Sequence, residues 1–289
     1  MMRRITDEEI DFFHANGYVI CRSVFHDDEM ANVREETTRL IDEILTGGPA
    51  KDWSVEGPEG VPFELEYLHM HPNTFSMRLL AHPFIGDLLT RIVGPDFIPS
   101  YETLVFKLKN NGSSVPWHRD SMVTNDDDPL FQIDIYPDKS TIENSCVWVI
   151  PKSHRWEKDE AIEWMEREKK EWRARGKTDF GVPGAIPAEV EPGDVMLHNS
   201  KVIHGSPENK SGKQRRVVYF DNRSVSLNEK YEWWPHELME KRCLLYQAAL
   251  HERRTNPYPS DDECFDYSLP DGLPAWAPGA PVDLHCSRD

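Results

Sequence analysis

A change of hydrophobic period near residue 101 constrains the fold of this chain more than any other feature. From there to about residue 225, short segments either alternate apolar and polar residues or form brief apolar runs between Pro, Gly and Asn. They read YETLVFKLKN, LFQIDIY, SCVWVIP, GDVMLHN and RRVVYFDN. A period of two is typical of β-strands with one buried face. Many short strands of this kind favour a closed or double-sheet β core.

Helical patterns flank these strands on both sides. The spacing of Thr6 and Glu9 predicts a capping box at the start of a first helix, which ends at Gly17. Periodic apolar residues or charged runs predict further helices over 27–47, 84–93, 157–176 and 236–254.

We therefore expect a single α+β domain over residues 1–289. Its parts are N-terminal helices and first strands (1–100), a β core (101–225), a helical insertion within that core (157–176), and a C-terminal helix and tail (226–289). The insertion carries a thin apolar stripe formed by Ile162, Met165 and Trp172. This stripe predicts that the insertion packs over one side or the mouth of the β structure.

Composition argues against several classes of partner. The 289-residue chain has a formal net charge of −18 and a pI near 5.1, whereas binding to nucleic acids or anionic membranes needs a basic surface. No apolar run is long enough to span a bilayer, and MMRRITDEEIDFF lacks the apolar core of a secretory signal. The five cysteines are scattered and show no CxxC spacing, which favours reduced thiols and a cytoplasmic location.

The segment PWHRDSM places an imidazole and a carboxylate two residues apart. His118 and Asp120 lie at the end of a predicted strand, where residues i and i+2 share a face. Two histidines and one carboxylate around a metal with open positions are characteristic of non-haem Fe(II) oxygenases. The pair alone is weak support, because a surface pair or a structural salt bridge has the same spacing. A third ligand is needed from another part of the chain.

Downstream, His198 and His204 are the candidates for that ligand. Gly205 and Ser206 follow His204, and their small side chains let the chain turn close to a metal. Eleven residues after His204, Arg215 opens a predicted strand. A keto acid that chelates iron needs a cation about one molecule's length away for its distal carboxylate. A guanidinium binds a carboxylate through two charge-assisted hydrogen bonds.

These segments resemble the phytanoyl-CoA dioxygenase family of Fe(II)/2-oxoglutarate-dependent oxygenases. The resemblance spans residues 5–222 and is carried by TDEEIDFFHANGYVI, WHRD, DKSTIENSCVWVIPKSHRW and GDVMLHNSKVIHGSPENKSGKQRR. It implies a double-stranded β-helix (jelly-roll) core and an enzyme that uses Fe(II), 2-oxoglutarate and O2. It also implies His118, Asp120 and His204 as the iron ligands and Arg215 as the 2-oxoglutarate anchor.

Two details of these motifs bear on the assignments. Arg216 competes with Arg215, but alternation along a strand lets only one of them point inward, and the spacing from His204 favours Arg215. In PKSHR, Lys152 stands where the family usually has glycine, which suggests a less strained turn and leaves the metal ligands unaffected. His154 in the same turn is expected to be structural or to lie at the pocket edge.

Other side chains are candidates for contact with the cosubstrate. Lys107, Gln132 and Thr141 could each reach 2-oxoglutarate, although a solvent-facing position is favoured for Lys107. His198 is open between a pocket role and a core role. A second metal site at the His-Met-His segment 69–71 is not expected, because no downstream partner with a comparable context exists.

Further residues bear on the charge of the substrate. Tyr231, Trp233 and Trp234 are expected in core or lid packing more than in substrate contact, although with nearby acids they would suit a cationic amine. Unassigned arginines would instead suit a carboxylate, phosphate or phosphonate: Arg78, Arg223, Arg253 and Arg254.

The predicted function is hydroxylation of an unactivated C–H bond in a small, charged metabolite, with release of succinate and CO2. Asp120 argues against halogenation, because halogenating relatives need the carboxylate position for chloride. Two alternatives stay open. The same cofactors could serve desaturation, cyclisation or epimerisation in natural-product biosynthesis, or the chain could be a non-catalytic jelly-roll sensor that binds metal. We expect a monomer or homodimer with a small-molecule substrate and no nucleic-acid or membrane partner.

Overall fold

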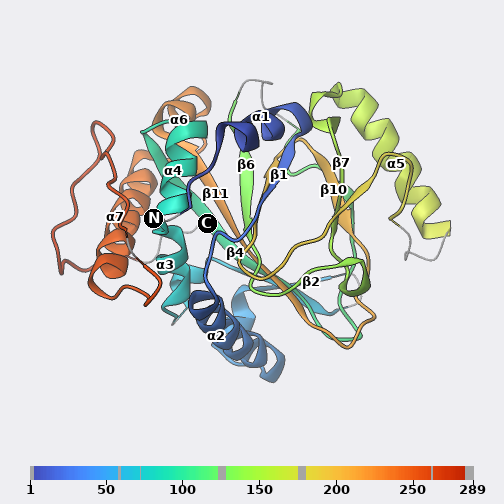
Figure 1. Cartoon of the computed structure of the whole chain (residues 1–289), viewed down its shortest axis with the longest axis horizontal. Coiled ribbons are helices and arrows are strands. Elements are labelled where there is room, and N and C mark those ends of the chain that lie inside the picture. The colour runs from blue at the N-terminus through green and yellow to red at the C-terminus, as the bar shows by residue number, and fades with distance from the viewer. Residues whose placement is uncertain are drawn as a thin grey trace.

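The predicted strands form two antiparallel sheets that face each other across a shared core (Figure 1). The computed structural model describes residues 3–57, 60–71, 73–122, 128–174, 180–261 and 263–283. The larger sheet contains, in spatial order, β1 (Tyr18–Cys21), β9 (Val195–Asn199), β6 (Phe131–Ile135), β11 (Arg215–Ser224), β4 (Phe97–Lys107), β3 (Pro62–Glu66) and β2 (Ser54–Glu56). The smaller sheet contains β5 (Val115–His118), β10 (Ile203–Ser206), β7 (Val147–Ile150) and β8 (Ile186–Ala188). The α+β, double-stranded β-helix prediction is confirmed.

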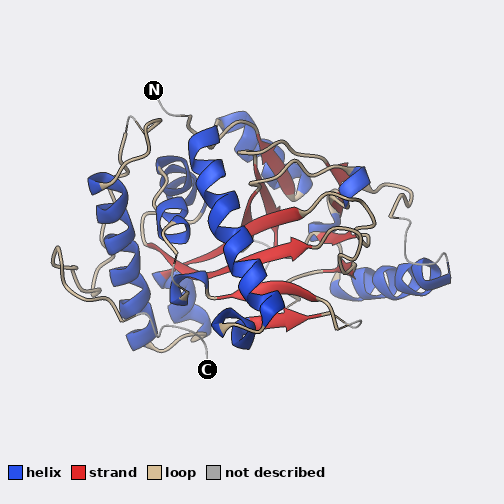
Figure 2. Ribbon diagram, turned by 90° about the horizontal axis from the view of Figure 1, so that it is seen from below, coloured by secondary structure: helices blue, strands red, loops and turns tan. Residues whose placement is uncertain are grey.

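Helices cover the outer face of the larger sheet, whereas α5 (Lys158–Ala174) lies against the smaller sheet. The other helices are α1 (Asp7–Asn16), α2 (Asp27–Thr46), α3 (Phe75–Leu80), α4 (Pro83–Ile92), α6 (Val225–Tyr231) and α7 (His236–Thr255). Figure 2, seen from below Figure 1, shows a long helix lying across the strands. Val33 and Leu40 of α2 share a buried apolar cluster with Leu104 of β4 and Phe220 of β11. Burial of these side chains against the sheet is the main force that holds the helical layer in place.

The first helix begins and ends as predicted. The Thr6 hydroxyl accepts the Glu9 N–H at 3.2 Å, and the Glu9 carboxylate accepts the Thr6 N–H at 3.0 Å. Gly17 follows the helix with a φ of 81°, a left-handed conformation that glycine adopts without steric cost.

The helical insertion packs on the outside of the smaller sheet, at the opposite end of the molecule from α7 (Figure 1). Ala161 and Trp172 of α5 are buried in one cluster with Trp117 of β5, and Met165 packs against that cluster. The apolar stripe that contacts the sheet therefore differs from the predicted one, because Ala161 takes part in the contact and Ile162 does not. The helix turns by 100° per residue, so a stripe through Ala161 and Met165 leaves Ile162 at its edge.

Alternation along the central strands divides their residues between two environments. On β11, Val218 and Phe220 join the cluster beneath the helices, whereas Val217 and Tyr219 face the space between the sheets. The register of β11 with β4 places Tyr219 opposite Thr103. This inner face is the surface on which the candidate site is built.

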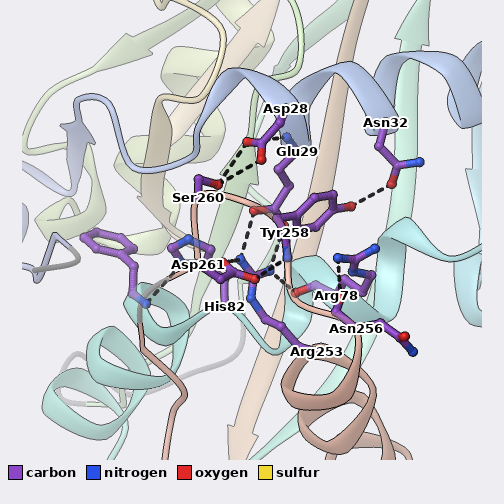
Figure 3. Close-up of polar contacts among 11 residues, drawn as sticks. Asp28, Glu29, Asn32, Arg78, His82, Arg253, Asn256, Tyr258, Ser260 and Asp261 are labelled. Carbon is purple, nitrogen blue, oxygen red and sulfur yellow. Dashed lines mark hydrogen bonds and ion pairs between the residues drawn. The ribbon is translucent and has the colours of Figure 1, made fainter.

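The segment after α7 is anchored to α2 through a buried charge cluster (Figure 3). Arg253 of α7 donates to Glu29 of α2 at 2.7 and 3.0 Å and to Asp261 at 2.5 Å. Tyr258 donates its hydroxyl proton to Asn32 at 2.7 Å. Because the Arg253 side chain is only 3% exposed, its two carboxylate partners replace the water that the charge has lost.

Two further predictions can be compared with the structure. Among the described cysteines, Cys21, Cys146 and Cys243 are buried, Cys264 is exposed, and none forms a disulfide. Within the described ranges, no helix combines the length and the apolar character that crossing a bilayer requires.

Candidate functional site

Two neighbouring strands of the smaller sheet bring the predicted metal ligands together. His118 ends β5 and pairs in register with His204 of β10, so their ring centroids are 4.2 Å apart. Asp120 follows two residues after His118, and its Oδ1 lies 3.4 Å from Nε2 of His118 and 3.6 Å from Nε2 of His204. One ligand atom from each of the three residues lies within 4.8 Å of the others.

The hydrogen bonds of the two histidines fix which nitrogen faces the centre of this group. Nδ1 of His118 lies 2.9 Å from the carbonyl oxygen of Pro116, and Nδ1 of His204 lies 3.1 Å from that of Val202. A carbonyl oxygen only accepts, so Nδ1 carries the proton and Nε2 presents its lone pair. Ligands about 2.1 Å from one ion lie about 3 Å apart, which is close to the observed separations. The residues present therefore fit a metal held by two imidazoles and one carboxylate.

The charges of the group also suit a metal. Burial acts to raise the pKa of Asp120, but His204, His118 and His198 together hold that pKa well below its usual range. Burial and the neighbouring His118 lower the pKa of His204 to about 3. An ionised carboxylate and a neutral imidazole are the forms that bind metals.

His198 belongs to the site as a partner of Asp120, which resolves the choice between a pocket role and a core role. Its Nε2 lies 3.0 Å from Oδ2 of Asp120, and its Nδ1 lies 2.9 Å from Oδ2 of Asp134. Burial acts to lower the pKa of His198, but Asp134 and Asp120 outweigh it and raise that pKa to about 10. The imidazolium thus donates to both carboxylates, and it leaves Oδ1 of Asp120 facing the other two histidines.

Gly205 follows His204 for a reason that differs from the one expected. A Cβ at this position would lie 2.8 Å from the ring of Phe180 and 2.9 Å from the carbonyl oxygen of Val115. Glycine therefore lets β10 approach β5 closely, and this approach, rather than a turn beside the metal, sets the distance between the two histidines.

A cavity of about 230 Å³ adjoins the triad between the two sheets. Its polar walls, apart from the triad and His198, are Glu64, Tyr101, Thr103, Gln132, Ser206, Arg215 and Tyr219. Its apolar walls are Phe63, Val105, Val115, Val147 and the backbone of Gly205. The partly open space beside the triad is suited to small organic molecules.

Arg215 presents unpaired donors to this cavity. Its Nη1 donates to the carbonyl oxygen of Ser145 at 3.1 Å, whereas its buried Nε has no partner among the described residues. Arg216 points to the opposite face, where it forms a bidentate pair with Asp138 at 2.7 Å and donates to Arg34. As predicted from strand alternation, the side chains of the two arginines therefore lie on opposite faces of β11. The free edge of Arg215 fits the planar carboxylate of a keto-acid cosubstrate.

The three other cosubstrate candidates have different positions. Gln132 lines the cavity. Lys107 is buried, contrary to the solvent-facing expectation, and its ammonium group donates to the carbonyl oxygens of Ser206 and Pro207. Burial and the adjacent Arg215 hold the pKa of Lys107 well below its usual range.

Thr141 does not line the cavity. Its backbone N–H donates to Asn144 Oδ1 at 2.7 Å and its hydroxyl lies 3.3 Å from the same atom, which caps the short helix Ile142–Asn144. It borders a separate surface hollow with Lys139 and Glu143. The structure therefore gives Thr141 a capping role, and its contact with 2-oxoglutarate stays a prediction.

Two histidine motifs are structural. The turn that contains His154 has Lys152 at a φ of 68°, so it keeps the left-handed conformation and is not relaxed as expected. Nε2 of His154 lies 3.3 Å from the carbonyl oxygen of His14. In the 69–71 segment, buried His69 contacts Glu102.

The four arginines considered for an anionic substrate do not line the cavity. Arg253 is buried against α2, and the guanidinium carbon of Arg78 lies 3.5 Å from the ring centroid of Tyr258. Arg223 pairs with a carboxylate of its own strand at 3.1 Å, and Arg254 lies 3.4 Å from a carboxylate in the C-terminal segment. The structure therefore gives these four guanidinium groups partners away from the cavity lining.

The aromatic residues after β11 pack against one another. Tyr231 stacks on Trp233 with 4.5 Å between ring centroids and an interplanar angle of 11°. Trp234 is buried in a cluster with Met239 and Cys243. They therefore pack as expected, outside the cavity lining.

Sequence reasoning missed part of the cavity wall. Tyr101 and Thr103 alternate with the buried side of β4, so the period-two pattern could have placed them beside the site. Glu64 and Phe63 lie near the sheet edge on β3, and their position depends on the pairing of Glu64 with Val105, which no local pattern reveals.

Comparison with known proteins adds independent findings. The profile of the phytanoyl-CoA dioxygenase (PhyH) family matches residues 13–217. The chain is 26% identical to the dioxygenase lolE1 of Epichloe uncinata over 245 residues, which cover 81% of this chain and 90% of the relative. It is 25% identical to the methylphosphonate hydroxylase of Gimesia maris over 246 residues, which cover 80% and 86%. The crystal structure of EctD from S. alaskensis with 2-oxoglutarate and 5-hydroxyectoine has a TM-score of 0.62, with 19% identity and 77% coverage of each chain.

Proposed function

Because the chain belongs to the phytanoyl-CoA dioxygenase family of non-haem Fe(II)/2-oxoglutarate-dependent oxygenases, we propose that it hydroxylates an unactivated C–H bond of a small, charged metabolite. Succinate and CO2 are the coproducts. The observation that carries this proposal is the pairing of the open triad with the unpaired edge of Arg215 in one cavity.

Each residue of the site has a distinct part in this proposal. His118, Asp120 and His204 hold Fe(II) through Nε2, Oδ1 and Nε2. Arg215 holds the distal carboxylate of 2-oxoglutarate. When bound, Fe(II) and 2-oxoglutarate supply the activation of O2 that hydroxylation requires. His198 keeps the carboxylate of Asp120 in one orientation through the hydrogen bond described above.

The size of the cavity supports a small substrate. A volume of about 230 Å³ must accommodate the cosubstrate and the reacting part of the substrate together. An acyl-CoA would have to leave most of its length outside this space.

Desaturation, cyclisation and epimerisation would use the same residues, so product analysis distinguishes them from hydroxylation. A metal-binding sensor would not need an inward-facing guanidinium with unpaired donors. The free edge of Arg215 therefore supports an enzyme that binds a cosubstrate.

The test is release of succinate from 2-oxoglutarate by the purified protein with Fe(II) and O2. We expect slow release without substrate, and loss of that release in Asp120→Ala. The exposed helical variant Asp11→Ala is the matched control and should behave as wild type. Absence of succinate release, together with no binding of 2-oxoglutarate by calorimetry in the presence of Mn(II), would refute the proposal.

A further inference from the structure

One carboxylate on the cavity wall has no part in the chemistry proposed above. Glu64 of β3 pairs in register with Val105 of β4 and lines the same cavity as the triad. Its Oε1 accepts hydrogen bonds from the hydroxyl groups of Thr103 at 3.0 Å and Tyr101 at 3.3 Å. Neither the metal ligands nor the cosubstrate anchor need this negative charge.

The two hydroxyl groups do not balance the charge of Glu64. The Thr103 hydroxyl also lies 2.9 Å from the carbonyl oxygen of Leu65, and the Tyr101 hydroxyl lies 3.0 Å from Glu66. Each hydroxyl has one proton, so it donates fully to only one of its acceptors. Within the described part of the chain, Glu64 forms no ion pair and its Oε2 accepts no hydrogen bond. Burial raises the pKa of Glu64, although the Thr103 hydroxyl acts in the opposite direction.

The other charged side chains of the cavity wall favour a cationic substrate over an anionic one that would bind beside 2-oxoglutarate. Two cations are among the described lining residues. Arg215 has its free edge assigned to 2-oxoglutarate, and the imidazolium of His198 already donates to Asp120 and Asp134. Asp120 and Glu64 are the acids in the same lining. The aromatic rings of Phe63 and Tyr101 also line this cavity, and aromatic faces stabilise ammonium groups.

We infer that the substrate is a small organic cation whose ammonium group is bound by Glu64. The inference rests on the proposed function and adds the sign of the substrate charge to it. An ammonium N–H would donate to Oε2 of Glu64, which has no other donor, and Phe63 and Tyr101 would border the adjoining carbon atoms. An anionic substrate placed here would meet the carboxylate of Glu64, which forms no ion pair with a described residue, so Glu64 disfavours phosphonates and carboxylates.

The test uses compounds of one carbon skeleton that carry an ammonium, a hydroxyl, a carboxylate or a phosphonate group. Each compound is assayed with the Fe(II)-loaded enzyme for succinate release above the level seen with 2-oxoglutarate alone. We expect ammonium compounds to stimulate release, and the neutral and anionic analogues to stimulate it at least about 10-fold less.

Variants of Glu64 link that preference to one side chain. Glu64→Gln keeps the size of the residue and the oxygen that accepts from Tyr101 and Thr103, but it removes the charge. We expect it to raise the KM for the ammonium substrate about 10- to 100-fold, while Glu64→Asp keeps the preference for ammonium over hydroxyl. Glu56→Gln, the same change at an exposed position of β2, should leave that KM unchanged.

Basal succinate release separates this inference from the proposed function. If the wild type shows no basal release, the proposed function is wrong. If basal release is present but no ammonium compound stimulates it, or anions stimulate it as strongly, the inference is wrong. It is also wrong if Glu64→Gln retains the wild-type KM for the cation. A wild-type urea unfolding curve for Glu64→Gln shows that this variant is folded.

Discussion

Replacement of Arg215 by alanine should separate cosubstrate binding from folding. The guanidinium lies on the inner face of β11, where Nη1 is occupied by Ser145 and Nε is unpaired. The cosubstrate carboxylate would therefore take the edge formed by Nε and Nη2. Truncation removes this edge without exposing a buried ion pair, because Arg215 forms none among the described residues.

The expected magnitude follows from the two hydrogen bonds that this edge would donate. Hydrogen bonds to charged groups contribute about 1.5–3 kcal/mol each, and water that enters the emptied space recovers part of the loss. We expect a net loss of about 3 kcal/mol, which corresponds to a rise of about 100-fold in the KM for 2-oxoglutarate. The assay is succinate release as a function of 2-oxoglutarate concentration, with calorimetry in the presence of Mn(II) as a measure of binding alone.

Arg216→Ala is the matched control because the residue is adjacent in sequence and faces the opposite side of the sheet. It would leave the half-buried Asp138 without the bidentate partner that now lies at 2.7 Å. Loss of one member of a fully buried pair costs about 3–5 kcal/mol, and a smaller cost is expected for this partly exposed pair. Urea unfolding should therefore shift while the KM for 2-oxoglutarate stays within about twofold. A KM for 2-oxoglutarate that is unchanged in Arg215→Ala, or that rises equally in both variants, would contradict the assignment.

Three further predictions concern stability and metal binding. Arg253→Met should lower the free energy of unfolding in urea by about 3–5 kcal/mol, because it leaves Glu29 buried without a partner, while the KM for 2-oxoglutarate stays at the wild-type value. The pKa of His198 is raised in the folded state to about 10, above its ordinary 6.5. Its contribution to the stability of the metal-free protein is therefore complete below pH 6.5 and lost as the pH rises toward 10. His198→Gln should flatten that part of the curve of unfolding free energy against pH, and an unaltered curve would count against the imidazolium bridge. Gly205→Ala should cost about 1–3 kcal/mol in urea unfolding and weaken Mn(II) binding measured by calorimetry, because the added Cβ separates β10 from β5; equal Mn(II) affinity would contradict this.

The parts of the site that could be predicted are those set by local periodicity or by the family motifs. Two residues at i and i+2 of a strand end share a face in any strand, so His118 and Asp120 were predictable as a pair. The same period separates Arg215 from Arg216. His204 needed the family resemblance, because spacing alone did not distinguish it from His198.

The parts that could not be predicted depend on partners that are distant in sequence. The period-two pattern of its strand allows Lys107 to point inward, but it does not show what would stabilise a buried lysine. The stabilising partners are the carbonyl oxygens of residues 206 and 207, about a hundred positions later in the chain. Thr141 has a local partner in Asn144, but Thr-x-x-Asn is a weaker capping signal than a Ser/Thr-x-x-Glu spacing. The position of Glu64 in the cavity wall follows from the pairing of β3 with β4, which the sequence alone does not predict.

The position of Glu64 near the sheet edge also suggests how the family could vary its substrates while it keeps one reaction. The proposed metal ligands lie on β5 and β10 and in the segment after β5, and the arginine proposed to hold the cosubstrate lies on β11. A change in any of them is expected to disturb binding of the metal or the cosubstrate. The strand β3 lies between β4 and the edge strand β2, outside that set, yet Glu64 reaches the same cavity. A substitution there changes the charge offered to the substrate without moving Arg215 or the triad. Family membership therefore defines the cofactors of this chain, whereas the sign of the substrate charge depends on a residue that the family motifs do not include.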